Sequence, residues 1–312
     1  MEMPLAFNSG NIRAISETKA FIRISAPIGI TADSQENIME LACEYAFAGG
    51  QVFIDSGAFT AFNKGIDLDI DSAIGKDFWD KVFHKYFELA EGAGPGVLNM
   101  RFVAPDQVGN REITTKNVDW LTYKINDLHA LGCKIIQNIQ KDKFNNEVAD
   151  IFINIADISG WYNHFEDVVI GFPSKAKAWN LNSIYRYVEY MKIRGEECDW
   201  PMEPLEIHLM GKGDPVQLVE ICYKMNKITP TILSGDSVAT ASIVGKGKRL
   251  TEDFNKLKTK MELKLYRYLS RPERGRLRGY LLGEIETEKR EKARKLFKEL
   301  NNGNPVQQEL LA

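Results

Sequence analysis

The sequence predicts an α/β protein, a (β/α)8 barrel of the TIM type followed by a basic helical extension. Three observations support this prediction: short apolar runs alternate with amphipathic stretches, seven such runs are clear, and most of them end on Gly, Asp or Gln. Alternation of strands with helices is typical of a parallel sheet. Seven or eight repeats of this unit favour a closed barrel over an open sheet, and 312 residues can form one barrel.

The expected strands are seven short runs rich in apolar and β-branched residues. They are Ala20–Ile28, Gln51–Asp55, Arg101–Ala104, Cys133–Gln137, Val168–Phe172, Leu205–Met210 and Pro230–Ser234. A closed barrel needs an eighth strand, for which either Pro4–Asn8 or Ala239–Val244 is a candidate.

Stretches with helical periodicity lie between these runs. The five clearest are Ser34–Ala46, Ala73–Glu91, Asn117–Leu131, Leu181–Arg194 and Pro215–Met225. The part of the chain after Lys246 shows no strand pattern. It predicts helices near Asp253–Leu269 and Glu284–Leu300, separated by a break at Arg271–Gly275 (RPERG).

The composition shifts near residue 250, which predicts the domain boundaries. We expect a catalytic barrel over 1–250, a helical extension packed on it over 251–300, and a flexible tail over 301–312. Thr251–Leu300 carries 15 Lys and Arg against 9 Asp and Glu, although the whole chain has a net charge of −3. This basic end is either a phosphate-binding surface or a solvated helical face, and charge alone favours the second.

The composition, with 44% hydrophobic and 27% charged residues, is ordinary for a soluble protein and provides for a large apolar core. The scattered cysteines and the lack of an export signal favour a cytoplasmic location. No apolar run is long enough to span a membrane, and the first residues do not resemble a secretion signal. The spacing of the four histidines predicts no structural zinc site, so we expect no metal and no cofactor. The cysteines, expected to be reduced thiols without a C-x-x-C pair, are Cys43, Cys133, Cys198 and Cys222.

Three carboxylates, Asp55, Asp106 and Asp236, stand at the ends of expected strands. The carboxyl ends of all strands meet at one face of a (β/α)8 barrel, and that face carries the active site. Paired carboxylates suit nucleophilic attack at an anomeric carbon with proton transfer, but acidic clusters also bind Mg²⁺, and the spacing leaves both uses open. Asp236 could instead cap a helix that begins at Ser237, and Asp55 could be a turn residue.

Five segments between about residues 50 and 250 resemble, in order and rough spacing, motifs of the tRNA-guanine transglycosylase superfamily. The segments are Phe53–Phe59 (FIDSGAF, similar to D-S-G-G-F), Val103–Asp106 (VAPD), Ile135–Gln137 (IIQ, similar to V-Q-G-G), Ile207–Gly213 (IHLMGKG, similar to Y-L-M-G-V-G) and Ser234–Ser237 (SGDS). The resemblance implies a base-exchanging enzyme that works through a covalent Asp–glycosyl intermediate on a (β/α)8 barrel.

Where the motifs differ, the sequence resembles one branch of the superfamily, the DNA-modifying, DpdA-like enzymes. Ala58 replaces the second Gly of D-S-G-G-F, Asn138 and Ile139 replace the Gly pair of Q-G-G, and Gly171–Ser174 only loosely matches G-G-L-A-V-G. The superfamily's C-terminal zinc cluster of three cysteines and a histidine has no counterpart. This branch exchanges guanine in DNA for a 7-deazaguanine such as preQ0, so the implied partners are DNA and that small molecule. Whether a partner protein or a homodimer takes part stays open.

The resemblance also implies a role for each motif residue. Asp236 would be the nucleophile at C1′, and Asp55 would be the general base that deprotonates the incoming base. Asp106 and Gln137 would read the edge of guanine, with the carboxylate accepting from N–H groups and the amide donating to O6. The remaining base-pocket residues that it implies are Ser56, Gly57, Phe59, Gly171, Met210 and Gly211.

Basic residues near the nucleophile are the expected phosphate contacts. Lys246, Lys248 and Arg249 follow the nucleophile loop, Lys212 lies in the L-M-G motif, and Arg274 lies in the extension. A flexible solvent loop is the alternative for the first three. A target base inside a duplex must be flipped out or presented on a single strand. Three other hypotheses stay open: a tRNA-modifying enzyme, a non-catalytic nucleic-acid-binding barrel subunit, and a metal-dependent barrel hydrolase.

Overall fold

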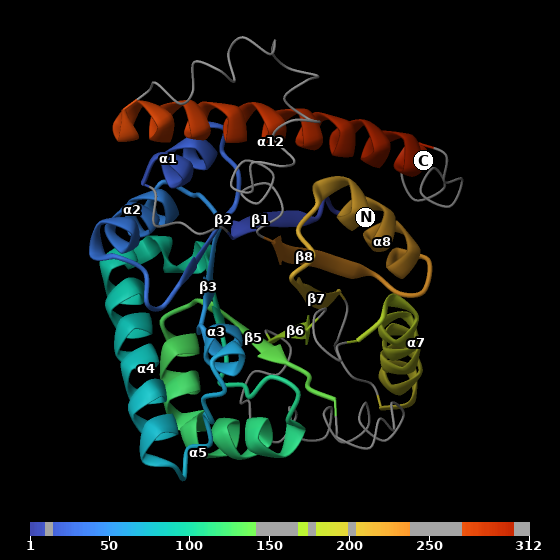
Figure 1. The fold of residues 1–312 in the computed structure, drawn as a ribbon. Helices are drawn as coiled ribbons and strands as arrows, with labels where there is room; N and C mark the ends of the chain where they lie inside the picture. Colours follow the sequence, from blue (N-terminus) through green and yellow to red (C-terminus); the bar gives the residue numbers. More distant parts are fainter. Residues whose placement is uncertain (10–14, 142–167, 174–178, 199–203, 238–269, 303–312) are drawn as a thin grey trace.

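A closed barrel of eight parallel strands forms the centre of the molecule (Figure 1). The computed structural model describes residues 1–9, 15–141, 168–173, 179–198, 204–237 and 270–302. Each strand pairs with the next one along the chain, and the last strand pairs with the first. The predicted (β/α)8 barrel is therefore confirmed. The strands are β1 (Leu5–Ser9), β2 (Ile28–Thr31), β3 (Val52–Asp55), β4 (Met100–Val103), β5 (Lys134–Asn138), β6 (Val168–Pro173), β7 (Leu205–Met210) and β8 (Thr231–Ser237).

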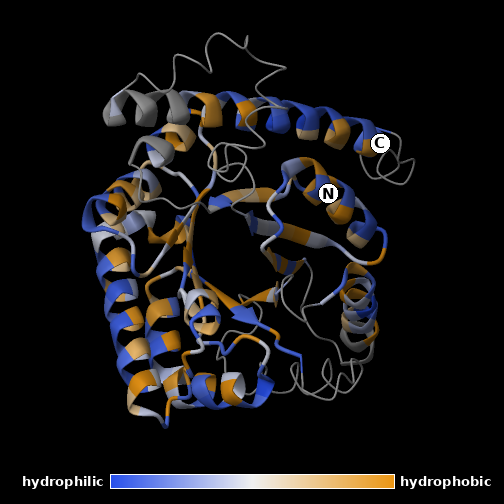
Figure 2. Ribbon diagram, in the orientation of Figure 1, coloured by the Kyte–Doolittle hydropathy of each residue, from blue (hydrophilic) through white to orange (hydrophobic). Residues whose placement is uncertain are grey.

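Helices surround the strands, with hydrophilic residues on their outer sides (Figure 2). They are α1 (Ile15–Arg23), α2 (Glu36–Phe47), α3 (Ala58–Asn63), α4 (Ala73–Ala93), the 3-10 helix η1 (Gly94–Asn99), α5 (Arg111–Ala130), α7 (Leu181–Cys198), α8 (Pro215–Asn226) and α12 (Arg271–Asn302). Local sequence explains where several begin: the side chain of Ser72 accepts a hydrogen bond at the start of α4, and Asp214 does so at the start of α8. In the described part of the chain, no helix is long and apolar enough to cross a membrane.

The expected strand at Ala20–Ile28 is wrong, because its first part is the end of α1 and only its last residue belongs to β2. Ala20 and Phe21 are buried on α1, and Ser25, with a φ of 53°, lies in the turn that leads to the strand. A short apolar run can be a strand or the buried side of a helix, since periodicity cannot separate them over so few residues.

The structure also decides the position of the eighth strand and the expected helix break near the C-terminus. The eighth strand is β1, close to the expected Pro4–Asn8, whereas Ala239–Val244 lies outside the described residues. The expected break at Arg271–Gly275 is wrong, because α12 begins at the first residue of that segment. Proline is tolerated in the first turn of a helix, where its missing N–H would have had no partner within the helix. Pro272 therefore lies in the first turn of a helix instead of interrupting one.

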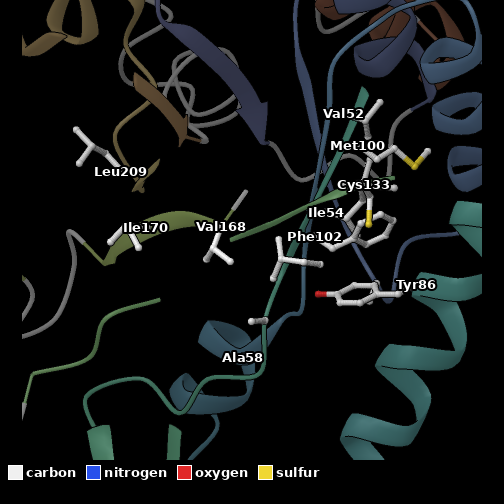
Figure 3. Close-up of a cluster of buried hydrophobic side chains, with 14 of the residues drawn as sticks. Val52, Ile54, Ala58, Tyr86, Met100, Phe102, Cys133, Val168, Ile170 and Leu209 are labelled. Atoms are coloured by element: carbon white, nitrogen blue, oxygen red, sulfur yellow. The ribbon is translucent and has the colours of Figure 1, made fainter. Parts of the chain in front are cut away.

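The barrel interior is filled by a buried apolar layer that several strands contribute. The layer consists of Phe7, Phe53, Val103, Ile136 and Val169. A second, larger apolar core lies between strands and helices, and Figure 3 shows part of it, with Tyr86 of α4 among the strand residues. Side chains alternate along a strand, so the residue two positions beyond a member of the interior layer also points inward, nearer the barrel mouth.

Helix α12 packs against α1 and α8 and lies across one side of the barrel (Figure 1). The Asn8 side chain of β1 donates a hydrogen bond of 3.1 Å to the carboxylate of Glu286. Arg290, one turn further along α12, donates to the carbonyl of Ala6 at 3.0 Å. The C-terminal helix is therefore attached to the first strand through buried or partly buried polar contacts.

The same helix is also joined to α8 by an ion pair, since Lys289 lies 3.3 Å from Asp214. Helix α12 thus connects the first strand with the helix that precedes the last strand. Of the expected extension over 251–300, residues 251–269 lie outside the described part of the chain, and so do residues 303–312 of the expected tail.

Candidate active site

All three predicted carboxylates lie at the mouth formed by the carboxyl ends of the strands. Asp55 is the last residue of β3, Asp106 follows the end of β4 closely, and Asp236 lies in β8. The charges of Asp236 and Asp106 both raise the pKa of Asp55, which shows that the three groups are near one another. Strand β8 continues to Ser237, so the alternative in which Asp236 caps a helix starting there is wrong.

Asp236 is held at the mouth by two polar neighbours. Its Oδ1 accepts a hydrogen bond of 2.7 Å from the backbone N–H of Gly211, and the Nε2 atom of His208 lies 3.4 Å from the same oxygen. The loop after β7 passes directly over β8, since a Cβ at Gly235 would overlap the Lys212 carbonyl. Both described contacts use Oδ1 and the side chain is 14% exposed, which leaves Oδ2 for a ligand.

His208 lies inside the barrel behind Asp236 and is fully buried. Its Nδ1 lies 2.9 Å from the Ser234 hydroxyl, and its ring stacks on Phe53 with centroids 4.8 Å apart and planes 10° apart. Burial lowers the pKa of His208, the contact with Asp236 opposes this shift, and the charge of Arg101 lowers the pKa further. The ring is therefore neutral at neutral pH, and each of its nitrogens has a polar neighbour.

Asp55 begins the tight turn that leads from β3 into α3. Its Oδ1 accepts from the Gly57 N–H at 3.2 Å, and the Ser56 hydroxyl accepts from the Ala58 N–H at 3.2 Å. Gly57 has a φ of 84°, which glycine adopts without strain. Burial raises the pKa of Asp55 to about 7, helped by the charge of Asp236 and opposed by the Gly57 N–H. Such a carboxyl group can both donate and accept a proton near neutral pH.

Asp106 is buried and held by two side-chain amides. Its Oδ2 accepts from Asn138 Nδ2 at 3.2 Å and from Gln140 Nε2 at 2.8 Å, while Gln140 Oε1 accepts from the Gly109 N–H at 2.9 Å. Burial raises the pKa of Asp106 to about 6, and the two amide hydrogen bonds oppose that shift. The amides fix the orientation of a carboxyl group whose charge changes just below neutral pH.

Gln137 does not join this group, contrary to the expectation from the motif. It pairs in register with Ile170, which packs in the core between strands and helices, so Gln137 faces the helices. Its Nε2 donates to the Asn138 carbonyl at 3.1 Å. Asn138 itself shares the inward face of Ile136 and therefore reaches Asp106. Strand alternation thus brings the next amide, and not the expected one, to the carboxylate.

The side-chain oxygen of Asn138 accepts no hydrogen bond within the described residues. A carboxylate only accepts, so Asp106 requires the N–H side of the amide and turns Oδ1 away from itself. This Oδ1 is buried and has no hydrogen-bond partner within the described residues. It lies against Gly171, where a Cβ would overlap it, so glycine at this position makes room for the amide. Buried acceptors are nearly always satisfied, so this oxygen beside Asp106 is an exception within the described residues.

The remaining predicted residues differ in how close they lie to the mouth. Met210 packs against the interior layer, and Phe59 of α3 is 37% exposed with its ring stacked on Phe62. Lys212 is partly exposed in the loop that crosses β8. Arg274 belongs to α12, but its side chain is not among those that the structure describes. The expected phosphate contacts that lie wholly outside the described residues are Lys246, Lys248 and Arg249.

Sequence reasoning missed His208, Asn138 and Gln140 as residues of the site. The signal for His208 was present, because it stands two positions before Met210 in one strand and therefore shares its inward face. Asn138 could have been found by the same rule. Gln140 lies beyond the end of β5, where strand alternation no longer applies. Among the side chains described, no three or more of Asp, Glu, His and Cys are grouped so that they could hold a metal ion.

Comparison with known proteins adds the fold and nothing finer. No protein-family model matches this sequence, and neither does any curated protein. Among solved structures, the chain is similar to a fructose-bisphosphate aldolase from Campylobacter jejuni, with a TM-score of 0.52 and 10% identity over 92% of this chain and 89% of that one. An L-ribulose 3-epimerase is matched with a TM-score of 0.42 and 13% identity, over 97% and 99% of the two chains. The likeness to the aldolase concerns the barrel alone, because one fold serves many chemistries.

Proposed function

We propose that this protein is a transglycosylase that exchanges guanine in DNA for a 7-deazaguanine base through a covalent glycosyl intermediate on Asp236. The observation that carries the proposal is a pair of carboxyl groups at the barrel mouth with different surroundings. Asp236 is held by the Gly211 N–H, whereas Asp55 has its pKa raised to about 7. Base exchange at C1′ requires two such groups, one as nucleophile and one as proton carrier. The order of the sequence motifs supports guanine as the base, and the departures from those motifs, with the missing zinc cluster, support DNA as the polymer.

The exchange takes two displacements at C1′. In the first, Oδ2 of Asp236 attacks C1′ of the target nucleoside, the C1′–N9 bond breaks, and guanine leaves with the electron pair and a proton from Asp55. In the second, the incoming base gives its N9 proton to Asp55, N9 attacks C1′, and the C1′–O bond breaks to release the Asp236 carboxylate. A group with a pKa of about 7 serves both steps because it changes charge easily at neutral pH.

Asp106 and Asn138 supply acceptors for the edge of the base. The Asn138 Oδ1 is buried without a partner among the described residues, and Asp106 stands beside it, fixed by Gln140. Guanine and the 7-deazaguanines carry neighbouring donors, a ring N–H and an exocyclic amine, which match a pair of acceptors. A base without these donors leaves buried acceptors unpaired, which costs about 1–3 kcal/mol for each.

The experiment is incorporation of radiolabelled guanine into single-stranded and duplex DNA and, in parallel, into bulk tRNA. Asp236→Asn removes the nucleophile but keeps an oxygen that can accept from Gly211. The matched control is Asp127→Asn, which changes an exposed carboxylate on α5. We expect label in DNA with the wild type and the control, and below about 1% of that level with Asp236→Asn.

The other possible results of this labelling experiment would each point to a different conclusion. Label in tRNA alone would assign the protein to the tRNA-modifying members of the superfamily that its motifs resemble. Full incorporation by Asp236→Asn would move the nucleophile to another residue. Label in neither polymer with the wild type would overturn the proposal as stated, and would leave the non-catalytic barrel subunit as the hypothesis to pursue.

A further inference from the structure

We propose that Ser234 and His208 form a positioning relay that holds Asp236 in the arrangement needed to release the exchanged nucleotide. The relay rests on the function proposed above and concerns its second displacement. Ser234 Oγ lies 2.9 Å from His208 Nδ1, and His208 Nε2 lies 3.4 Å from Asp236 Oδ1. His208 and Ser234 are both buried and are register partners across β7 and β8.

The backbone places the three side chains in a row. Ser234 and Asp236 are two residues apart on β8 and therefore point to the same, inward side of the barrel. The ring of His208 from β7 spans the interval between them. Stacking on Phe53, with planes 10° apart, and a tilted contact with Phe7 at 6.1 Å fix the plane of that ring. Its two nitrogens can therefore meet Ser234 and Asp236 without further movement.

These contacts decide which nitrogen of His208 carries the hydrogen. A carboxylate oxygen only accepts, so Nε2, which faces Asp236, must be the donor. Nδ1 is then an acceptor, and the Ser234 hydroxyl donates to it at 2.9 Å in preference to the Ile207 carbonyl at 3.3 Å. Burial keeps the ring in this neutral form by lowering its pKa. Without the hydroxyl, the ring can adopt the other tautomer, which turns a lone pair toward Asp236.

The donors on Oδ1 matter most when Asp236 leaves. In the covalent intermediate Oδ2 is bonded to C1′, and Oδ1 is the ester carbonyl oxygen, which still accepts from Gly211 and His208. When N9 of the incoming base attacks C1′, the C1′–Oδ2 bond breaks, its electron pair returns to Asp236, and the N9 proton goes to Asp55. Negative charge grows on the carboxylate in this step, so oriented donors lower its barrier. In the first displacement the carboxylate loses charge, so the same donors give no help.

The test measures the two displacements separately in three variants. Ser234→Ala removes only the hydroxyl that sets the tautomer, whereas Ser234→Thr keeps a hydroxyl at that place. Thr231→Ala is the matched control, since it removes another buried hydroxyl of β8, one that donates to the Thr229 carbonyl. Each protein is mixed with an end-labelled oligonucleotide that contains guanine, and the covalent complex in quenched samples is measured on a denaturing gel. Free guanine is then added to the remaining reaction, and the decay of the complex is followed in the same way.

We expect the covalent complex of Ser234→Ala to form at the wild-type rate within about threefold and to decay at least about tenfold more slowly. Ser234→Thr and Thr231→Ala should follow the wild type. His208→Phe keeps a stacked ring but lacks both nitrogens, so its complex should decay about a hundredfold more slowly.

Two results would overturn the relay. One is a complex of Ser234→Ala that decays at the wild-type rate, and the other is an equal loss in both displacements, which is what a merely structural role of the hydroxyl would produce. A wild-type protein that forms no covalent complex and exchanges no guanine would instead remove the proposed function, and the relay with it. The failure of the inference is thus distinguishable from the failure of the function on which it rests.

Discussion

Replacing Asp55 by Asn tests the electrostatics of the barrel mouth through stability, without any substrate. The substitution is nearly isosteric, and its side-chain oxygen can still accept from the Gly57 N–H. It removes the negative charge, which in the wild type is partly buried beside Asp236 and Asp106. If these three groups are as close as the structure has them, the loss of that charge stabilises the fold at alkaline pH while it abolishes exchange.

The size of the effect follows from the pKa of Asp55, which rises from 3.8 to about 7 in the folded protein. Between these values the folded protein holds a proton that the unfolded chain has lost, so stability falls as the pH rises from about 4 to 7. One pKa unit corresponds to about 1.4 kcal/mol, which gives a penalty of at most about 4 kcal/mol above pH 7. Asn has no charge at any pH, so the variant gains little over the wild type at pH 4.5 and most at pH 8.

The assay is thermal unfolding of the wild type, Asp55→Asn and the exposed control Asp127→Asn at pH 4.5 and pH 8. For a chain of this size, 1 kcal/mol shifts the melting temperature by about 2 °C, so Asp55→Asn should gain several degrees at pH 8 and little at pH 4.5. The control should show no such difference between the two pH values. An equal gain at both values, or a loss at pH 8, would refute the view that Asp55 is a partly buried carboxyl group whose charge is opposed by its neighbours.

Three further outcomes are expected. Gly171→Ala puts a methyl group against the Asn138 amide, and should lower kcat/KM for the incoming base about tenfold in a base-competition assay; an unchanged value would separate this amide from base binding. Gly235→Ala forces two backbones apart, and should destabilise the protein by more than about 2 kcal/mol in urea unfolding; a neutral result would contradict the close crossing of loop and strand. Charge reversal at Lys246 and Lys248 should weaken DNA binding and reduce its salt dependence, and an unchanged salt slope would exclude this segment from the binding surface.

Much of the fold could be predicted because short apolar runs alternate with helical stretches along the chain. Part of the site could be predicted because most of these runs end on a Gly, Asp or Gln. Asp55 and Asp236 were found in this way, and both lie at the barrel mouth. The run at Ala20–Ile28 failed because its apolar residues serve the buried side of a helix, and nothing local separates that use from a strand. Arg271–Gly275 failed because a proline in the first turn of a helix resembles a helix break.

The rest of the site depends on whether a side chain points into the barrel or toward the helices. A sequence motif alone does not predict this. Gln137 and Asn138 are adjacent amides, and only the strand register decides that the second one faces the interior. His208 becomes informative once Ser234 is known to be its register partner, and the two are separated by the whole of α8. Gln140 contacts Asp106 from beyond the strand, where the path of the loop decides its place.

The attachment of α12 to β1 has a consequence for the synthesis of the chain. Asn8 and Glu286 are 278 residues apart, yet they form a buried hydrogen bond. At about 5–20 residues per second, a ribosome needs roughly 15 to 60 s to add the second residue after the first. Until β8 (Thr231–Ser237) has also been made, which takes most of that interval, β1 has no neighbour on the side that β8 later fills, and an open strand edge is exposed to other nascent chains. The barrel therefore closes only after Ser237, the attachment of α12 waits for a further 49 residues up to Glu286, and pairing over such long separations is intrinsically slow.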